Sequence, residues 1–412
     1  MIQMVRFEIK KMLSKTGGKI ALVMIFLIVV IVSVFAVRSV DFVKSDGSSI
    51  TGIRAAKELR YMKSAWTGYL TEDVFAEVIR LNAEVEETPE AQSKDWHESN
   101  KAYAMKQGYL DIRDIINSAL SPFREYNYYN IDGADPGVAS EIYERRIANL
   151  ENWLASDEAK DRYSETKKQF FVDQYSEIET PLYYEDADGW KALLEYSQTV
   201  IMLTMLILSF LVCNIFSGEY HLKADSVFFS SLEGRRKGVK AKLLAGLLLI
   251  SIIYWSVILI YSLVVLSALG SGGWNCPIQV SLYGWKSFYN ITFLENYTLT
   301  VLGGYVGILF ILTTELFISV ITRSAVVSIT FPFVLLFLPS FVGSINSISG
   351  ILGLMPDQLL QISVAVRLFN AYEFGNTVVG ALPILFMVYS MLFIILIRSV
   401  YKELHADRET GC

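Results

Sequence analysis

Five cations stand close together just before a long apolar run. They are Arg235, Arg236, Lys237, Lys240 and Lys242. Cations that flank an apolar run act by electrostatics, either by holding a loop on one side of a membrane or by orienting a partner surface. This stretch therefore points to a membrane interface and not to a catalytic centre.

The residues before these cations have the pattern of an amphipathic helix. The apolar positions recur at i, i+4, i+7, i+8 and i+12, which places them on one face of a helix. They are Tyr220, Ala224, Val227, Phe228 and Leu232. Polar residues cover much of the remaining surface, namely His221, Lys223, Asp225 and Ser230. The stretch from 216 to 244 predicts a short helix at the cytoplasmic mouth of a membrane bundle, or else a basic helix that only sets topology.

Glu315 is the one acid well inside an apolar run. A carboxylate within the membrane is costly, so it is by default a candidate for function. The alternative is that Glu315 lies near the inner interface and pairs with Arg323, or with a cation of the 235–242 cluster. Both interpretations stay open at this stage.

Motifs of enzyme chemistry are missing from the sequence. There is no GxxxxGK[ST] phosphate loop, no HExxH and no GxSxG motif. His97, His221 and His405 are scattered, which does not suggest a metal site. We therefore expect no catalytic residue, no bound metal and no cofactor in this chain, and no nucleic-acid partner.

Six apolar runs are long enough to cross a bilayer as helices. They cover residues 20–37, 197–216, 243–269, 297–321, 325–342 and 377–397. The first run lacks a small-residue cleavage signal after it, so we interpret it as a retained membrane helix. A basic amphipathic segment precedes it, in which Val5, Ile9 and Met12 share one face. The expected fold is an all-α integral membrane protein with six transmembrane helices.

Charge is concentrated in one block of the 412-residue chain. Residues 38–192 contain 30 acidic and 19 basic residues, a net charge of −11, whereas the remainder has 12 and 17, a net charge of +5. The block is long enough to bury its own core. We predict a domain organisation of 1–37 (surface helix and first span), 38–192 (a large, mainly helical extracellular domain) and 193–412 (membrane domain).

Local patterns predict several elements. Thr71 is a candidate N-cap, because two acids and an apolar helical stripe follow it. Further helices are expected at 109–120 and 139–154, and a loop at 127–137. Residues 355–375 predict a helix or re-entrant hairpin at the outer surface, too short and polar to cross.

Basic residues in the short loops predict the orientation. The N-terminal segment has five and the 217–242 loop has six, whereas the 270–296 loop has only Lys286 and the 343–376 loop only Arg367. We therefore expect a multi-pass protein of the plasma membrane with both termini in the cytoplasm. The 38–192 block is expected outside.

The arrangement resembles the membrane (permease) subunits of type-2 ATP-binding-cassette (ABC) exporters. The likeness lies in the basic surface helix, the six spans and the outer segment before the sixth span. Its most specific part is the first cytoplasmic loop, where Glu219 begins the segment, 220–232 matches a coupling helix, and the Ala241-Lys242 pair leads into the third span. The family often has a proline near the turn at 234–236, and this chain has Leu232-Glu233 before it instead.

The resemblance implies that this chain is a transporter subunit and not an enzyme. It implies a separate ABC ATPase subunit that holds ATP and Mg, and a second permease copy or a paralogous permease. The residues implied to contact the ATPase are Glu219, Tyr220, His221, Lys223, Asp225, Val227, Phe228, Arg235, Arg236 and Lys242. The expected cargo is a peptide, a lipid or a drug. The alternative is a membrane sensor whose outer domain binds a ligand or an envelope partner without transport.

Overall fold

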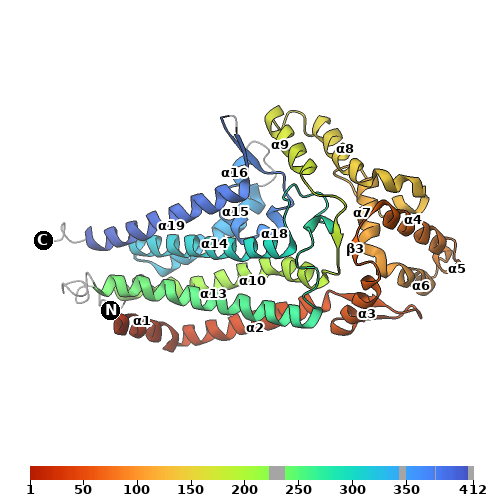
Figure 1. Ribbon diagram of the computed structural model, residues 1–412. Coiled ribbons are helices and arrows are strands. Elements are labelled where there is room, and N and C mark those ends of the chain that lie inside the picture. The colour runs from red at the N-terminus through yellow and green to blue at the C-terminus, as the bar shows by residue number, and fades with distance from the viewer. Residues whose placement is uncertain (222–236, 343–348, 376, 407–412) are drawn as a thin grey trace.

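The chain folds into an apolar helical bundle with a helical domain at one end (Figure 1). The computed structural model describes residues 1–221, 237–342, 349–375 and 377–406. Within them, five helices are long and apolar enough to cross a membrane. They are α2 (Thr16–Arg38), α10 (Asp188–Val212) with its continuation α11 (Asn214–His221), α13 (Val239–Leu269), α14 (Phe293–Thr322) and α19 (Ala381–Ala406). The membrane character expected from the sequence is thus confirmed in its coarse form.

The predicted fifth span is also a helix, α15 (Ala325–Val342). It contains Pro332 and Pro339, and its apolar part, Ala325–Pro339, is shorter than the five long helices. Proline inside a helix removes a backbone hydrogen bond, which neighbouring groups must compensate in a membrane. By length and composition alone, five crossings are supported.

Capping and local packing set the ends of the long helices, so these ends do not coincide with the ends of the apolar runs. α10 begins nine residues before its predicted span because Trp190, Leu193 and Leu194 are already buried against neighbouring elements. α14 begins at a capping box in which the Thr292 side chain and Glu295 satisfy each other's backbone N–H groups. It ends at Arg323, whose φ of 55° is the left-handed conformation that commonly terminates helices.

α10 lies at the centre of the bundle and packs against α2, α13 and α14. Small residues let the helices approach closely. A Cβ atom on Gly304 of α14 would lie 2.8 Å from the Cδ1 of Ile201 on α10 and 2.7 Å from the hydroxyl of Tyr254 on α13. Glycine at helix contacts is a common device in membranes, where close packing replaces the hydrophobic effect.

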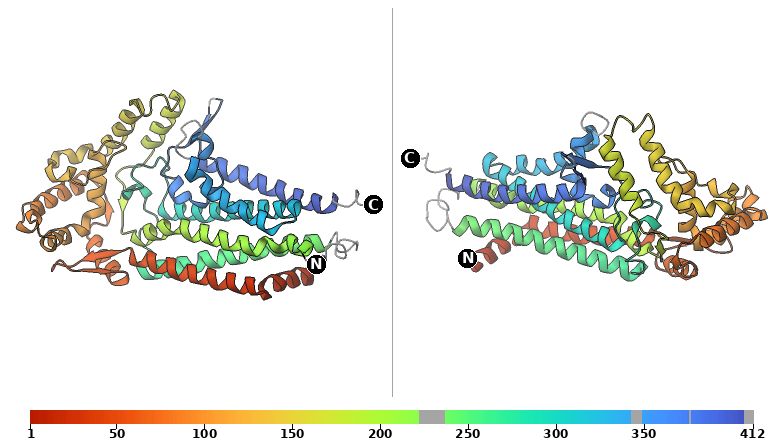
Figure 2. Two further views of the ribbon diagram at one scale, coloured as in Figure 1. Left: turned by 180° about the vertical axis from the view of Figure 1, so that it is seen from behind. Right: turned by 45° about the horizontal axis from the view of Figure 1, so that its top comes forward.

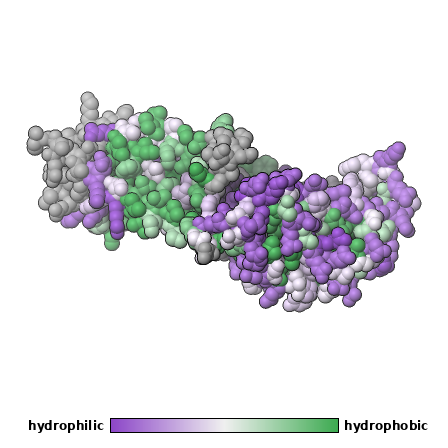
Figure 3. All heavy atoms as spheres, turned by 90° about the horizontal axis from the view of Figure 1, so that it is seen from above, coloured by the Kyte–Doolittle hydropathy of each residue, from purple (hydrophilic) through white to green (hydrophobic). Residues whose placement is uncertain are grey.

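α1 (Ile2–Ser14) lies at the end of the bundle away from the helical domain, as does the end of α19 (Figure 2). α1 packs against α13 and α2, with Val5 buried against Ala241 and Ala245. The surface in Figure 3 is hydrophobic over the bundle and hydrophilic over the domain. This contrast is the one expected from the segregated charge of the sequence.

The domain formed mainly by residues 38–192 is helical, with two small antiparallel strand pairs. Its helices are α3 (Ile53–Ser64), α4 (Glu72–Glu86), α5 (Pro89–Gln92), α6 (Trp96–Lys106), α7 (Leu110–Leu120), α8 (Ile142–Ala155) and α9 (Glu165–Ser176), with 3-10 turns η1 (Gln107–Tyr109), η2 (Asn130–Gly133) and η3 (Pro136–Glu141). β1 (Asp41–Val43) and β2 (Ser49–Thr51) form a hairpin, and β3 (Gly68–Tyr69) pairs antiparallel with the distant β4 (Tyr183–Tyr184). Helices are present at all three places the sequence predicted. Thr71 occupies the N-cap position of α4, but its side chain makes no capping hydrogen bond.

A later loop of the chain completes this domain. The guanidinium of Arg146 on α8 donates to the carbonyl oxygens of Trp285 and Ser287, each at 2.9 Å, near η5 (Ile278–Val280). Phe369 enters the same aromatic core beside Phe171, with ring centroids 5.0 Å apart. The domain is therefore built from three separate stretches of sequence, and its boundary predicted at residue 192 lies within the first turns of α10.

Residues 355–375, for which the sequence predicts a helix or a re-entrant hairpin, do not form one continuous helix. The short helix α16 (Ser349–Leu352) precedes them, and they contain the short helices α17 (Asp357–Leu360) and α18 (Ile362–Ala365). A hairpin of β5 (Ala371–Phe374) and β6 (Thr377–Gly380) follows. The sixth span was therefore predicted to start four residues too early, since α19 begins at Ala381. The physical reason is the aromatic and β-branched composition of 372–379, which favours strands, with Gly375 at a positive φ of 63° beside the turn.

Candidate functional site

Most of the predicted coupling segment lies outside the described residues. Glu219, Tyr220 and His221 close α11, where only the backbone is described. Lys223, Asp225, Val227, Phe228, Arg235 and Arg236 fall in the undescribed stretch 222–236. Lys242 is the one predicted partner-binding residue whose side chain is described.

The two ends of the 222–236 stretch lie at the same end of the bundle as α1. α11 leads into the stretch and packs against α14 and α15, while α13 follows it and packs against α1. A force applied to residues 222–236 would therefore reach the bundle through α11 and α13. These two helices, together with α1, form the mouth of the bundle.

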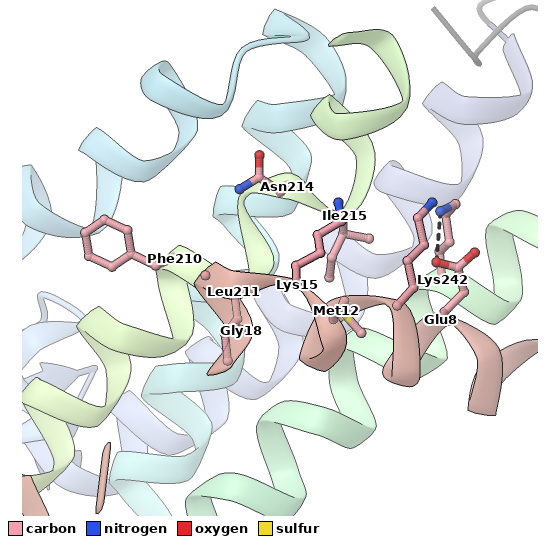
Figure 4. Close-up of a pocket in the computed structure, with 11 residues that line it drawn as sticks. Glu8, Met12, Lys15, Gly18, Phe210, Leu211, Asn214, Ile215 and Lys242 are labelled. Carbon is pink, nitrogen blue, oxygen red and sulfur yellow. Dashed lines mark hydrogen bonds and ion pairs between the residues drawn. The ribbon is translucent and has the colours of Figure 1, made fainter. Parts of the chain in front are cut away.

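Lys242 is buried at this mouth and forms an ion pair with α1. Its side chain is 2% exposed, and its Nζ lies 3.0 Å from the Oε2 of Glu8, which is 16% exposed (Figure 4). A buried cation is costly unless it is paired and hydrogen-bonded, so Glu8 offsets the burial of Lys242. The sequence contained one signal of this contact, because Glu8 is the only acid in a basic N-terminal segment.

A cavity of about 310 Å³ lies beside this ion pair (Figure 4). Its lining residues are Glu8, Lys11, Met12, Lys15, Gly17, Gly18, Phe210, Leu211, Asn214, Ile215 and Lys242. Three lysines against one glutamate make the cavity electropositive. It adjoins the start of α11, so it lies next to the point where the chain enters the predicted coupling segment.

The turn between α1 and α2 depends on Gly18. A Cβ atom at this position would lie 2.2 Å from the carbonyl oxygen of Met12, closer than real Cβ contacts allow. At the neighbouring Gly17 a Cβ atom would meet nothing within 4 Å. Gly18 therefore allows the close bend between α1 and α2 (Figure 1). Beyond this bend α1 packs against α13, where Glu8 meets Lys242.

Glu315 is fully buried in α14, with an exposed fraction of 0%. The Ser209 side chain of α10 lies beside it, but neither carboxylate oxygen of Glu315 nor the Ser209 hydroxyl has a hydrogen-bond partner among the described residues. Arg323, the partner considered from the sequence, is exposed at the C-terminal cap of the same helix. Because an unpaired buried charge is costly, this geometry suits a neutral carboxylic acid or one that meets a further group when the bundle rearranges.

A buried charge cluster joins the folded domain to the membrane bundle, and sequence reasoning missed it. Lys63 on α3 has its Nζ 2.9 Å from the Oδ2 of Asp111 on α7 and 2.6 Å from the Oδ2 of Asp188 on α10. Lys191, one turn further along α10, lies 2.7 Å from the Oδ1 of Asp111. The Tyr184 hydroxyl donates to Asp111 at 2.9 Å. The first turn of α10 is thus tied to two helices of the domain.

The cluster changes the pKa values of those members that lie outside the membrane-spanning helices. Burial by itself would lower the pKa of Lys63, but Asp111 and Asp188 raise this pKa well above its ordinary value. Burial would raise the pKa of Asp111, but Lys191 and Lys63 lower it below its ordinary value. Asp186 behaves in the opposite way, because burial and the neighbouring Asp188 carboxylate raise its pKa to about 6. At neutral pH the cluster therefore consists of charged, mutually paired groups, with Asp186 as its most easily protonated member.

The described part of the chain contains no group of three or more His, Cys, Asp or Glu side chains that could hold a metal ion. The buried ion pairs and the electropositive cavity suit the binding of a charged surface at the mouth of the bundle. Comparison with known proteins adds no assignment: no protein-family model, no curated protein and no solved structure matches the chain.

Proposed function

We propose that this chain is the membrane subunit of an ATP-driven exporter of the type-2 ABC class. In this proposal the chain has six spans, both termini are cytoplasmic, and the domain of residues 38–192 is outside. The observation that carries the proposal is the mouth of the bundle, where the Glu8–Lys242 ion pair holds α1 against α13 beside the start of α11. The surface helix α1, fixed next to the basic 217–242 loop, is a suitable binding surface for a cytoplasmic partner.

The proposed mechanism is mechanical. A separate ATPase subunit binds ATP and Mg and changes shape on hydrolysis, and it contacts the 222–236 segment and the residues around it. Movement of that segment pulls on α11 and α13, which are continuous with the bundle. The apolar helix from Asp188 to Ser217 has 30 residues and is about 45 Å long at 1.5 Å per residue, so it can carry displacement from the mouth to the folded domain.

The charge cluster at the far end of α10 supports this coupling. On α10, Asp188 pairs with Lys63 of α3 and Lys191 pairs with Asp111 of α7. A shift of α10 along its axis would therefore move the domain with it. A second permease copy, or a paralogous permease, completes the transport path in this proposal. The expected cargo remains a peptide, a lipid or a drug.

Co-purification tests the proposal. The tagged full-length chain is extracted from native membranes in mild detergent, and bound proteins are identified by mass spectrometry. We expect an ATPase subunit to be recovered with the chain and its ATP hydrolysis to depend on the chain. Glu219→Lys and Phe228→Gln should reduce both recovery and hydrolysis, whereas Glu403→Lys, on α19 at the same end of the bundle, serves as the matched control.

Two outcomes would count against the proposal. If no ATPase is recovered under conditions that keep the chain folded, the sensor alternative is favoured. If an ATPase is recovered but Glu219→Lys and Phe228→Gln behave like the Glu403→Lys control, the chain has an ATPase partner. In that case the partner does not bind through the predicted coupling segment.

A further inference from the structure

A long apolar groove runs along the side of the bundle between α2 and α13. Its volume is about 680 Å³, within the range of roughly 300–1,000 Å³ that is common for small-molecule sites. The lining residues are Leu22, Ile25, Phe26, Val29, Val30, Ser33, Val34, Val37, Arg38, Ile53, Ile252, Ile253, Ser256, Val257, Ile260, Val264 and Ala268. From Leu22 to Arg38 the groove follows α2 for about 24 Å, more than the roughly 15 Å of one leaflet's hydrocarbon.

Ser33 places an unsatisfied hydroxyl in this apolar groove. It is 3% exposed, and its Oγ has no hydrogen-bond partner among the residues that the structure describes. Ser251 and Ser262 on α13 donate to the backbone carbonyl four residues earlier, which is the usual solution in a membrane. Ser33 does not, and it shares this with Ser209 of α10, which faces Glu315 and not an open groove. The hydroxyl of Ser33 is therefore left for an acceptor that enters the groove.

One cation lines the end of the groove that lies next to the folded domain, and a second is on the helix beside that end. Arg38 lines the groove there, about 7.5 Å beyond Ser33 by helical rise, and it is exposed. α3 lies at the same end: Ile53 lines the groove, and the exposed Lys57 is one turn further along the helix. Arg60, on the same face of α3, donates to the carbonyl oxygen of Leu269 and so fixes α3 against the end of α13.

We propose that this groove binds an anionic phospholipid from the leaflet next to the folded domain. The phosphate meets Arg38 and Lys57, an ester carbonyl oxygen accepts the hydrogen bond from Ser33, and one acyl chain fills the apolar length between α2 and α13. The order of groups along the groove matches that of a phospholipid, in which the anion, the ester and the hydrocarbon follow each other from the surface inward. The inference does not rest on the exporter proposal.

Charge favours a lipid over a second copy of this chain. A two-fold interface built on this groove would bring the same surface of both copies together, and with it the cations of both. Like charges brought together are unfavourable. Apart from the hydroxyls of Ser33 and Ser256, the side chains that line the groove offer no acceptor. An anionic lipid satisfies the cations and the hydroxyl at once.

Native mass spectrometry of the purified full-length chain tests the inference. The chain is mixed with equal amounts of phosphatidylglycerol and phosphatidylcholine, and the bound fraction of each lipid is measured. We expect a preference for phosphatidylglycerol that Arg38→Gln reduces about fivefold, the effect of roughly one cation near an anionic lipid. Lys94→Gln, an exposed lysine between α5 and α6, should leave the preference unchanged.

A second pair of variants separates the groove from general lipid contact. Val30→Trp places a large ring in the groove, whereas Ile31→Trp changes the next residue, which is 50% exposed and does not line the groove. We expect Val30→Trp to remove most bound lipid of both kinds and Ile31→Trp to retain it. Ser33→Ala should weaken retention of both lipids without changing their ratio.

The inference is overturned if Val30→Trp and Ile31→Trp reduce bound lipid equally, or if Arg38→Gln leaves the lipid ratio unchanged. The same spectra report the oligomeric state. If Val30→Trp lowers the dimer fraction and leaves bound lipid unchanged, a second copy covers the groove and the lipid assignment is wrong.

Discussion

The Nζ of Lys242 lies 3.0 Å from the Oε2 of Glu8, although the two residues are 234 positions apart in the chain. Both side chains are largely buried, so the ion pair offsets part of the cost of burying the two charges. This contact holds the N-terminal surface helix against α13, at the end of the bundle where the predicted coupling segment begins and ends. It adds a polar contact to the apolar packing of Val5 on Ala241 and Ala245.

Replacing Glu8 by Gln should destabilise the protein. Lys242 would keep its charge in a buried site and lose a carboxylate partner, at a cost of roughly 2 kcal/mol. We expect a lower thermal transition in detergent, measured by intrinsic fluorescence. Arg6→Gln, at an exposed position of the same helix, is the control and should leave the transition within experimental error; an equal loss in both variants would contradict the role of the ion pair.

Gly18 and Gly17 should respond differently to alanine. Gly18→Ala would force its Cβ into the backbone of Met12, so the bend between α1 and α2 must change, whereas Gly17→Ala has open space. A thiol pair placed at positions 8 and 242 of a background without other cysteines reports this contact. We expect oxidation to link the pair in the Gly17→Ala background and to fail in the Gly18→Ala background. Efficient linking in both would show that the turn tolerates a side chain at residue 18.

Removing the buried cation Lys63 should loosen the junction between the domain and the bundle. Lys63→Met leaves Asp111 and Asp188 with only Lys191 between them, which we expect to cost about 3 kcal/mol. Limited proteolysis should cut the 38–192 domain faster in this variant. Lys94→Met provides the surface comparison, and unchanged protection in Lys63→Met would show that the cluster is not required for the junction.

Asp186 should make stability depend on pH in an unusual direction. Its pKa is raised to about 6 when folded, from an ordinary value of 3.8, because burial and Asp188 disfavour its charge while Lys63 and Lys191 only partly offset this. Between about pH 4 and 6 the folded state binds more protons than the unfolded state, so stability rises as pH falls through this range. Below it, protonation of Asp111, whose pKa is lowered, reverses the trend.

Thermal transitions at pH 5 and pH 7.5 check this expectation. The native chain should be more stable at pH 5, and Asp186→Asn should raise stability at pH 7.5 by roughly 2 kcal/mol and flatten the difference. The exposed Asp161→Asn variant should retain the native pH dependence. A native profile that falls monotonically from pH 7.5 to 5 would be inconsistent with the proposed behaviour of Asp186.

Orientation can be measured with cysteines placed at exposed positions. Cys276 is fully buried and is therefore a poor reporter. In a background with the native cysteines replaced by serine, we expect an impermeant thiol reagent on intact cells to label Lys94→Cys in the folded domain. Lys10→Cys on α1 should be labelled only after permeabilisation, and the opposite pattern would invert the topology.

The sequence by itself determined the broad division of this protein into an apolar bundle and a charged helical domain. An uncharged run such as 20–37 predicts a membrane-spanning helix, because a helix satisfies its own backbone hydrogen bonds and a run of this length matches the hydrocarbon core. Helical periodicity likewise located α4, α7 and α8 within a few residues. It failed at 371–380, where strand-forming side chains and a glycine at positive φ produce a hairpin.

Only the tertiary structure decided which distant groups meet. Glu8 with Lys242, and Lys63 with Asp111 and Asp188, are paired by the packing of helices far apart in the chain, and no local pattern encodes such a contact. The same holds for the lipid groove, since Ser33 is an ordinary serine until α13 covers one side of it. Local chemistry follows from neighbours in sequence, but the cost of burying a charge or a hydroxyl depends on neighbours in space.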